Sequence, residues 1–337
     1  MIREAIERAV SGRDLTLEEA SQVMREIMEG QATPAQLGGF LVALRLKGET
    51  ADEIAGMARV MREKALRVEV AGPLVDTCGT GGDGKGTFNI STAAAFVAAG
   101  AGLRVSKHGN RAASGLCGSA DVLEAAGVVI DLGPDSVRRC IEEVGIGFMF
   151  APLYHPAMKH AAGVRREIGV RTVFNILGPL TNPAGAQSQL VGVAQPDLGG
   201  VLARVLALLG THHALVVHGE DGADELSISG PSRVWEVKEG QVSERRVTPQ
   251  EAGLELAPLA ALKGGAPAEN AATLRRVLGG APGPMRGVVL LNAAAVLVAG
   301  ERATTLKEGV ALARQAVDSG AALAKLVGLV ALSQRLA

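Results

Sequence analysis

The chain has 337 residues, of which 47% are hydrophobic, 20% are charged and only 2% are aromatic. Its net charge of −1 gives no basic field for nucleic acid or anionic membranes, and three scattered cysteines exclude a disulfide framework or a thiolate metal cluster. The first residues carry acids and lack an apolar signal segment, and no uncharged stretch is long and unbroken enough to span a bilayer. We therefore predict a cytoplasmic protein that has no membrane segment and binds no nucleic acid.

Residues 1 to about 67 predict a compact unit of consecutive helices. Two threonines, Thr16 and Thr50, are each followed three residues later by glutamate, which is the capping-box pattern. Thr33-Pro34 places a cap before proline at the first helical position, and Gly48 ends that helix. The short spacing between these signals predicts short loops and close packing.

From Pro73 onward, short β-rich runs alternate with helical segments, which predicts a mostly parallel sheet flanked by helices. The predicted strands are 74–77, 103–106, 128–131, 190–193 and 214–218, and an antiparallel pair is expected at 232–237 and 241–247. The C-terminal part from Ala268 is predicted to be helical. The sequence thus predicts an α/β fold with a small all-helical domain, 1–67, and a larger α/β catalytic domain, 73–337.

The stretch from Asp76 to Thr92, DTCGTGGDGKGTFNIST, predicts a phosphate site. Glycine lets a ligand approach bare backbone N–H groups, and the helix expected from Asn89 onward would direct its positive end at the same anion. The loop lacks the Gly-Lys-Ser/Thr of a Walker A motif and does not match the dinucleotide fingerprint. A purely structural glycine turn is the alternative interpretation.

A second polar segment, Lys107-His-Gly-Asn-Arg111, joins two cations, an imidazole and an amide. Lys107 suits a phosphate as a point charge, and Arg111 offers a second cation. The alternative is a solvated basic turn, with His108 a packed or surface histidine. Downstream, Ser114 and Ser119 offer hydroxyl groups to phosphate oxygens, although Ser119 would serve equally well as the N-cap of a helix.

Three carboxylates lie together in Asp221-Gly-Ala-Asp-Glu225. An exposed acidic turn is the alternative, but a chain with an anion cradle favours Mg²⁺, which takes one or two carboxylates, waters and substrate phosphates. We choose Asp224 and Glu225 as ligands, with Ser91 as a hydroxyl ligand. Because the three polar segments each follow a predicted strand, we expect them to meet at one edge of the sheet.

Arg165 and Arg166 follow in a helical segment, where either is able to clamp a carboxylate bidentately or to lie solvated. His212-His213 is interpreted as structural because no matching ligand spacing accompanies it. No nucleophile elbow or Cys/His pairing is present in the sequence, so covalent catalysis is unsupported.

Taken together, these motifs resemble the anthranilate phosphoribosyltransferase family over the whole chain. The resemblance rests on Gly79–Asp83, Asn89–Thr92, Lys107–Arg111, Gly118–Asp121, Asn175–Pro183 and His218 with Asp224-Glu225. It implies transfer of the 5-phosphoribosyl group from phosphoribosyl pyrophosphate (PRPP) to the amino group of anthranilate in tryptophan biosynthesis, with Mg²⁺. It also implies a hinge between the domains, a return of the chain to the helical domain near 165–190, and a homodimer formed through that domain.

The resemblance assigns site residues by motif position. Those expected to bind PRPP are Gly79, Gly82, Asp83, Thr87, Asn89, Ile90, Ser91, Thr92, Lys107, Ser114, Gly115 and Ser119. Those expected near anthranilate are Gly79, His108, Asn110, Pro152, His155 and Arg165, with Arg165 on the carboxylate. Lys107 and Arg165 are the candidates for electrostatic and positioning roles in catalysis.

One segment departs from the family pattern. Where the family commonly has Ser-Ser-Lys-Ser, this chain has Ser114-Gly-Leu-Cys117, so a lysine and hydroxyl groups are missing. Two alternatives are a pyrimidine nucleoside phosphorylase-like enzyme on the same scaffold and a non-catalytic relative that binds nucleic acid. The acidic pair, the absence of the extra C-terminal domain of those phosphorylases, the intact motifs and the net charge argue against them.

Overall fold

The N-terminal part of the molecule is a helical bundle. The computed structural model describes residues 1–112 and 115–337, and the bundle begins with α1 (Ile2–Val10), α2 (Leu17–Met28), α3 (Pro34–Lys47) and α4 (Ala51–Lys64). Thr16 and Thr50 form the predicted capping boxes, and Thr33 forms a further one with Gln36. Gly48 ends α3 with φ at +89°, as the sequence predicted.

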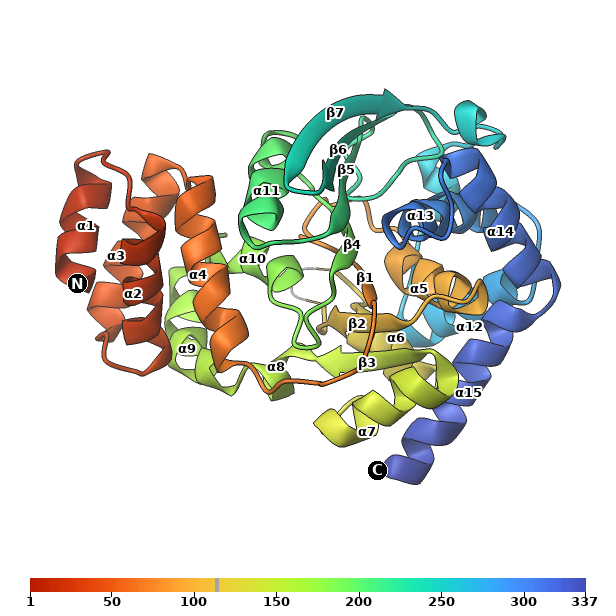
Figure 1. The fold of residues 1–337 in the computed structure, drawn as a ribbon, viewed down its shortest axis with the longest axis horizontal. Helices are drawn as coiled ribbons and strands as arrows, with labels where there is room; N and C mark the ends of the chain where they lie inside the picture. Colours follow the sequence, from red (N-terminus) through yellow and green to blue (C-terminus); the bar gives the residue numbers. More distant parts are fainter. Residues whose placement is uncertain (113–114) are drawn as a thin grey trace.

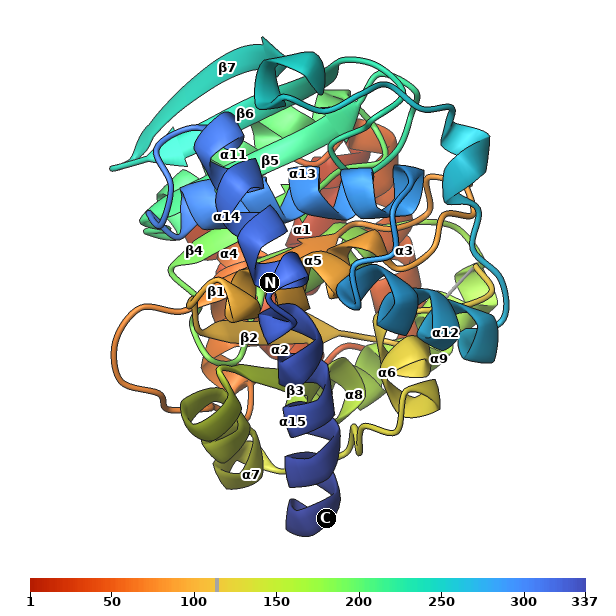
Figure 2. The same ribbon diagram turned by 90° about the vertical axis from the view of Figure 1, so that its right-hand side faces the viewer.

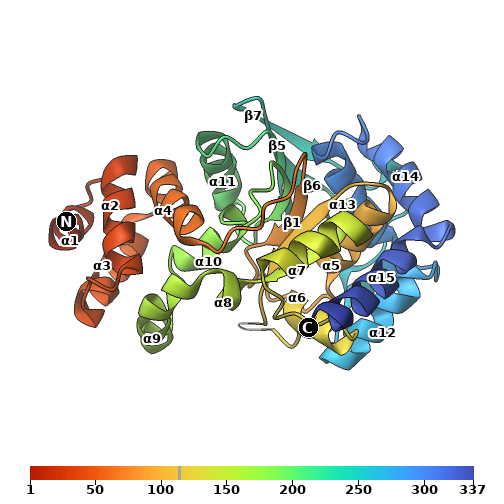
Figure 3. The same ribbon diagram turned by 60° about the horizontal axis from the view of Figure 1, so that its bottom comes forward.

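Helices from the middle of the chain pack onto this bundle (Figures 1 and 3). The chain passes through α8 (Ala151–Tyr154) to α9 (Lys159–Ile168), which contacts α2 and α3, and then to α10 (Phe174–Leu177), which contacts α4. The packing begins before residue 165, and residues 188–190 form part of a central strand. Phe174, Leu177 and Leu180 from the expected 165–190 segment belong to the same apolar cluster as the bundle helices.

The larger part is built on a sheet whose described strands have the order β3-β2-β1-β4-β5-β6-β7. The parallel strands are β1 (Val75–Gly79), β2 (Val105–Gly109), β3 (Ile146–Phe150), β4 (Ser188–Gly192) and β5 (His213–Gly219). The antiparallel strands β6 (Ser232–Lys238) and β7 (Gln241–Val247) continue the sheet from β5. The α/β class and the mostly parallel sheet are confirmed.

One predicted strand is wrong. Residues 128–131 form no strand, and β3, which the sequence analysis missed, occupies the place beside β2. Val128 and Ile130 are still buried, but the N–H of Val129 donates to Ser333 Oγ instead of to a neighbouring strand. Apolar β-branched residues are therefore buried here without forming a strand, and β3 pairs with β2 instead.

Alternate residues along the strands face two different apolar layers. Leu190, Leu215 and Val217 belong to the core shared with the C-terminal helices, whereas Val191 and Val216 belong to the core shared with the bundle. The first layer is covered by α5 (Ile90–Gly100), α12 (Pro267–Leu278), α13 (Pro284–Ala299), α14 (Leu306–Asp318) and α15 (Ala321–Leu336) (Figure 2). On the other face, α11 (Asp197–Leu208) packs on β5 and β6 and also contacts α4.

The shorter helices α6 (Ser119–Ala125) and α7 (Pro134–Arg139) complete the larger part, with α6 packed on α12. Among the described residues, no single helix is both long enough and apolar enough to cross a membrane. The pair α14 and α15 together reach that length but meet at a bend of 61°. All three cysteines are free.

Candidate functional site

The candidate site begins at the loop between β1 and α5. Its glycines are exposed, and Gly82 has φ at +75°, a left-handed conformation that a side chain rarely adopts. Within the described part of the chain, the backbone N–H groups of Gly82, Asp83 and Gly84 have no hydrogen-bond partner. Free N–H groups beside the start of an 11-residue helix make a suitable cradle for an anion.

The first turn of this loop is held by the sheet and by an acid. The N–H of Thr80 donates to the carbonyl of Gly192 at 2.9 Å, and Thr80 Oγ1 accepts from the N–H of Ala194 at 3.2 Å. The N–H of Gly81 donates to Asp224 Oδ2 at 2.9 Å. The loop after β1 and the acidic turn after β5 therefore meet, which confirms the expected convergence of these segments at one edge of the sheet.

Asp224 and Glu225 are half-buried carboxylates at the centre of this edge. Burial raises the pKa of Asp224 to about 6, and repulsion from Asp83 adds to the shift. Burial, followed by repulsion from Asp224, raises the pKa of Glu225 well above its ordinary value. Both carboxylates would be stabilised by a cation placed between them and the anion cradle.

The donor set fits Mg²⁺. Within the described residues, no three His, Cys, Asp or Glu side chains are placed to hold a metal by themselves. Mg²⁺ is commonly bound by one or two carboxylates and completes its octahedron with waters and substrate phosphates. The backbone of Ser91 opposes the rise in the pKa of Glu225, which places the third predicted ligand close to the pair.

A buried asparagine fixes the chain directly after the acids. Asn292 of α13 accepts from the N–H of Leu226 at 3.0 Å and donates to its carbonyl at 2.9 Å. We expect Asn292→Ala to destabilise the protein by about 2–4 kcal/mol, because both groups of Leu226 lose their buried partner. Leu226 directly follows Glu225, so loss of its hydrogen bonds to Asn292 is also expected to raise the Mg²⁺ concentration needed for half-maximal activity.

Urea unfolding and an Mg²⁺ titration of activity check this expectation. Ser333→Ala is the matched control, because Ser333 is also fully buried and holds a backbone N–H far along the chain from the acids. It should lower stability and leave the Mg²⁺ requirement unchanged. An unchanged Mg²⁺ requirement in Asn292→Ala would show that Asn292 serves only the core.

Lys107 lies inside the protein and not at its surface. Its ammonium group donates to the carbonyl of Thr77 at 2.6 Å, and its side chain is 2% exposed. Burial lowers the pKa of Lys107 and raises that of nearby Asp76, while the attraction between the two charges opposes both shifts. Asp76 also accepts from Asn182 Nδ2 at 2.7 Å, so the lysine belongs to a buried polar network under the loop.

Two predicted histidines lie next to each other, with their ring planes inclined at 59°. The rings of His108 and His155 have their centroids 5.1 Å apart, and both residues are 6% exposed. Burial lowers the pKa of His108 to about 3 and that of His155 to about 4, so both are neutral at physiological pH. The Nε2 atom of each ring is buried without a partner among the described residues.

The segment after β2 is organised by Asp121 of α6. Its carboxylate accepts from the N–H groups of Ala112 and Gly118 and pairs with Arg111. Arg111 also pairs with Glu124, so it is not the second free cation that the sequence suggested. Asn110 and Gly115 are exposed, and Ser114 lies outside the described residues.

Ser119 occupies the first turn of α6, and Gly118 is the N-cap, so the alternative of a Ser119 cap is wrong. The Ser119 hydroxyl donates to the carbonyl of Asn110 at 3.3 Å. A Cβ at Gly109 would collide with that hydroxyl group, which explains the glycine at this position.

The residues that open α5 are placed as follows. Asn89 donates to the carbonyl of Cys117 and accepts from Asn270 of α12, so it joins two neighbouring segments. Thr87 forms a bridge with Lys263, and Ile90 is buried. Thr92 is 1% exposed and its hydroxyl has no partner among the described residues.

The remaining predicted residues come from the segment beside the bundle. Arg165 on α9 is half-buried, with its guanidinium 5.2 Å from the ring centroid of Phe174. Burial lowers its pKa, whereas Arg166 is exposed. Pro152 is exposed on α8, three residues before His155.

Sequence reasoning missed several residues that shape the site, namely Asp76, Arg171, Asn182 and Asn292. Arg171 donates to the carbonyls of Thr80 and Gly81 from a segment ninety residues away. Asp76 stood at the start of the glycine stretch and Asn182 in the Asn175–Pro183 motif, but neither has a chemical signature of its own. Their roles depend on contacts between distant segments.

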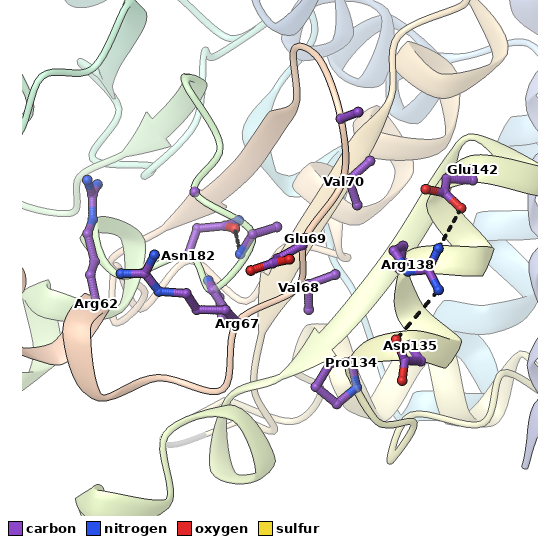
Figure 4. Close-up of a pocket in the computed structure, with 14 residues that line it drawn as sticks. Arg62, Arg67, Val68, Glu69, Val70, Pro134, Asp135, Arg138, Glu142 and Asn182 are labelled. Atoms are coloured by element: carbon purple, nitrogen blue, oxygen red, sulfur yellow. Dashed lines mark hydrogen bonds and ion pairs between the residues drawn. The ribbon is translucent and has the colours of Figure 1, made fainter.

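A separate groove of 910 Å³ lies between the segment that leads into β1, the start of α7 and the segment that leads into β4 (Figure 4). Arg138 in its wall pairs with Asp135 and Glu142, while Glu69 faces the same space. None of the predicted site residues lines this groove. The groove shares Asn182 with the buried polar network under the glycine loop.

Comparison with known proteins agrees with this geometry. The model of the helical bundle domain of a glycosyl transferase family matches residues 3–65, and that of its a/b domain matches residues 71–323. An anthranilate phosphoribosyltransferase of Dehalococcoides mccartyi is 59% identical over 339 residues, which cover 100% of this chain and 99% of the relative. That of Chloroflexus aurantiacus is 60% identical over 99% of both chains.

Solved structures agree as well. Anthranilate phosphoribosyltransferase from Thermus thermophilus superposes with a TM-score of 0.93 at 51% identity, covering 98% of this chain and 99% of that chain. The enzyme of Saccharomyces cerevisiae in complex with PRPP and Mg superposes with a TM-score of 0.91 at 28% identity, covering 99% and 98%. The chain belongs to the anthranilate phosphoribosyltransferase family.

Proposed function

We propose that this protein transfers the 5-phosphoribosyl group of PRPP to the amino group of anthranilate and releases pyrophosphate, a step of tryptophan biosynthesis. The observation that carries the proposal is the contact between the glycine loop and the acidic turn. The N–H of Gly81 donates to Asp224, and the free N–H groups follow directly after Gly81 in the loop. The candidate anion cradle and the candidate cation site therefore lie at the same edge of the sheet. A magnesium pyrophosphate group requires that combination.

The chain supplies electrostatic stabilisation and orientation. Negative charge grows on pyrophosphate as it leaves the anomeric carbon, and the backbone N–H groups of the loop with the start of α5 stabilise it there. Mg²⁺, held by Asp224, Glu225 and Ser91, would neutralise the leaving oxygens. The amino group of anthranilate attacks as a neutral nucleophile and loses its proton afterwards, so a strong general base is unnecessary.

The remaining residues are assigned either to the phosphoribosyl group or to anthranilate. The other PRPP contacts and Lys107 would surround the phosphoribosyl group, with the lysine acting through its field from beneath the loop. The unpartnered Nε2 atoms of His108 and His155, together with Asn110 and Pro152, would line the path of anthranilate. Arg165 would receive its carboxylate.

The test is the loss of anthranilate fluorescence when PRPP and Mg²⁺ are added. Conversion that depends on all three components is expected, and no conversion at micromolar enzyme would overturn the proposal. The phosphorylase and nucleic-acid alternatives receive no support, because the compared relatives are anthranilate phosphoribosyltransferases. The cytoplasmic location stays a prediction.

We also propose that residues 1–67 and the segment through α9 form a domain that pairs with a second copy of the chain. Gly38, Val42 and Leu46 lie four residues apart on α3, where Leu46 is 82% exposed and Val42 is 39% exposed. A hollow of 340 Å³ between α3 and α9 continues this apolar strip. An exposed apolar face on one helix suits an isologous interface.

Leu46→Glu is expected to weaken dimerisation by at least about 100-fold, because two carboxylates would be buried across a symmetric contact. Light scattering coupled to size-exclusion chromatography measures the mass. Leu208→Glu on α11 is the control, since Leu208 is 51% exposed but lies on another surface, and it should stay dimeric. A monomeric parent protein at all concentrations would refute the interface.

A further inference from the structure

Arg171 joins two parts of the molecule that are far apart in the sequence. It lies after α9, which ends at Ile168 with Gly169 as its C-cap at φ +69°, and before α10. Its Nη2 atom donates to the carbonyl of Gly81 at 3.0 Å and to that of Thr80 at 3.3 Å. A segment that follows a helix of the bundle therefore contacts the glycine loop directly.

The loop is shaped to receive this guanidinium group. A Cβ at Gly82 would collide with Arg171, so the glycine makes room for the contact. From the other side, the loop is held by Gly192 and Asp224 of the larger part. The partners of Arg171 are carbonyl oxygens, so no carboxylate neutralises its charge in this contact.

The two carbonyls belong to peptide groups whose N–H ends point to the site. The peptide group that carries the Thr80 carbonyl carries the N–H of Gly81, which donates to Asp224. The next peptide group carries the Gly81 carbonyl and the free N–H of Gly82. An anion bound to that N–H polarises the peptide group and makes the carbonyl a stronger acceptor for Arg171, because hydrogen bonds in a chain strengthen one another.

We propose that Arg171 is a positioning residue that couples binding of the pyrophosphate group to binding of anthranilate. This inference rests on the proposed function. Arg165, the candidate for the anthranilate carboxylate, lies six residues before Arg171. The ring of Phe174, which lies three residues after Arg171, packs against the Arg165 guanidinium. A stronger bond from Arg171 to the loop therefore holds the segment that carries both residues, and binding at one site favours binding at the other.

The experiment measures this coupling without turnover. The Kd of anthranilate is determined from its own fluorescence with and without Mg²⁺ and inorganic pyrophosphate, which binds as the leaving group but transfers nothing. For the parent protein we expect pyrophosphate to lower the Kd of anthranilate by about tenfold. By linkage, anthranilate must lower the Kd of pyrophosphate by the same factor, which calorimetry checks.

In Arg171→Ala the coupling factor should fall to about twofold or less, while the Kd of anthranilate alone changes by less than about threefold. Arg171→Lys keeps a donor without the planar fork and should retain part of the coupling, which also guards against a misfolded alanine variant. Arg314→Ala removes an exposed arginine from α14 and should keep the full factor.

A coupling factor of one in the parent protein, or an unchanged factor in folded Arg171→Ala and Arg171→Lys, would overturn the inference. Failure of the function itself is recognised separately. A parent protein that converts anthranilate but keeps its coupling in both variants disproves only the role of Arg171. One that neither binds nor converts anthranilate disproves the proposed function, and the coupling with it.

Discussion

Asp224→Asn is expected to lower kcat/KM by about 10³-fold, the cost of losing one preorganised charged group at a centre of developing charge. The Asp224 carboxylate accepts a hydrogen bond from the N–H of Gly81 and lies beside Glu225, so it holds the loop and would complete the proposed cation site. An amide keeps the size of the side chain but removes the charge. Steady-state kinetics across a series of Mg²⁺ concentrations measures the effect.

Glu225→Gln should have a similar effect, and excess Mg²⁺ should restore part of the activity of either variant. The control is Glu220→Gln in the same turn, because Glu220 pairs with Arg246 at the surface. Its activity should stay within about twofold of the parent value, since exposed ion pairs contribute little. Equal losses in Glu220→Gln and Asp224→Asn would argue for a general disturbance of the turn and against a cation site.

A further constraint at this centre comes from neighbouring glycines. A Cβ at Gly79 would approach the carboxylate of Asp224, and one at Gly192 would collide with the backbone of Asp224. The ends of β1 and β4 therefore cannot carry a side chain where the acidic turn packs against them. This packing holds the Asp224 carboxylate in place.

Arg165→Ala is expected to raise the KM of anthranilate by about 100-fold, which corresponds to about 2.7 kcal/mol for a charge-assisted contact with a carboxylate. The KM of PRPP should stay within about twofold, because Arg165 lies on α9 and the loop contacts come from other elements. Arg165 is half-buried against Phe174, so its charge is partly desolvated and a carboxylate partner gains more there than at the surface.

Arg166→Ala is the matched control, because Arg166 is the next residue on the same helix but is exposed. It should leave the KM of anthranilate nearly unchanged. An unchanged KM in Arg165→Ala would disprove the carboxylate clamp, and a rise in Arg166→Ala alone would assign the clamp to the neighbouring residue. Titration of anthranilate at saturating PRPP distinguishes these results.

Local signals in the sequence determined much of the architecture. Capping threonines and Gly48 act within a few residues, as does the short turn between 232–237 and 241–247, so the bundle helices and the pair β6–β7 were predicted correctly. The strand predicted at 128–131 is wrong although Val128 and Ile130 are buried, because an apolar run does not say which neighbour it will find. Only the assembled sheet decided that β3 lies beside β2.

For the site, the sequence by itself supplied groups suited to the proposed chemistry, namely glycines for an anion and acids for a cation, and the order of motifs that identifies the family. The tertiary structure alone decided which of these groups meet. It neutralised Arg111 with Asp121 and Glu124, buried Lys107 beside Asp76, and brought Arg171 to the glycine loop. The physical reason is that a residue type carries its charge and donors in the sequence, whereas burial and partners arise only when distant segments pack together.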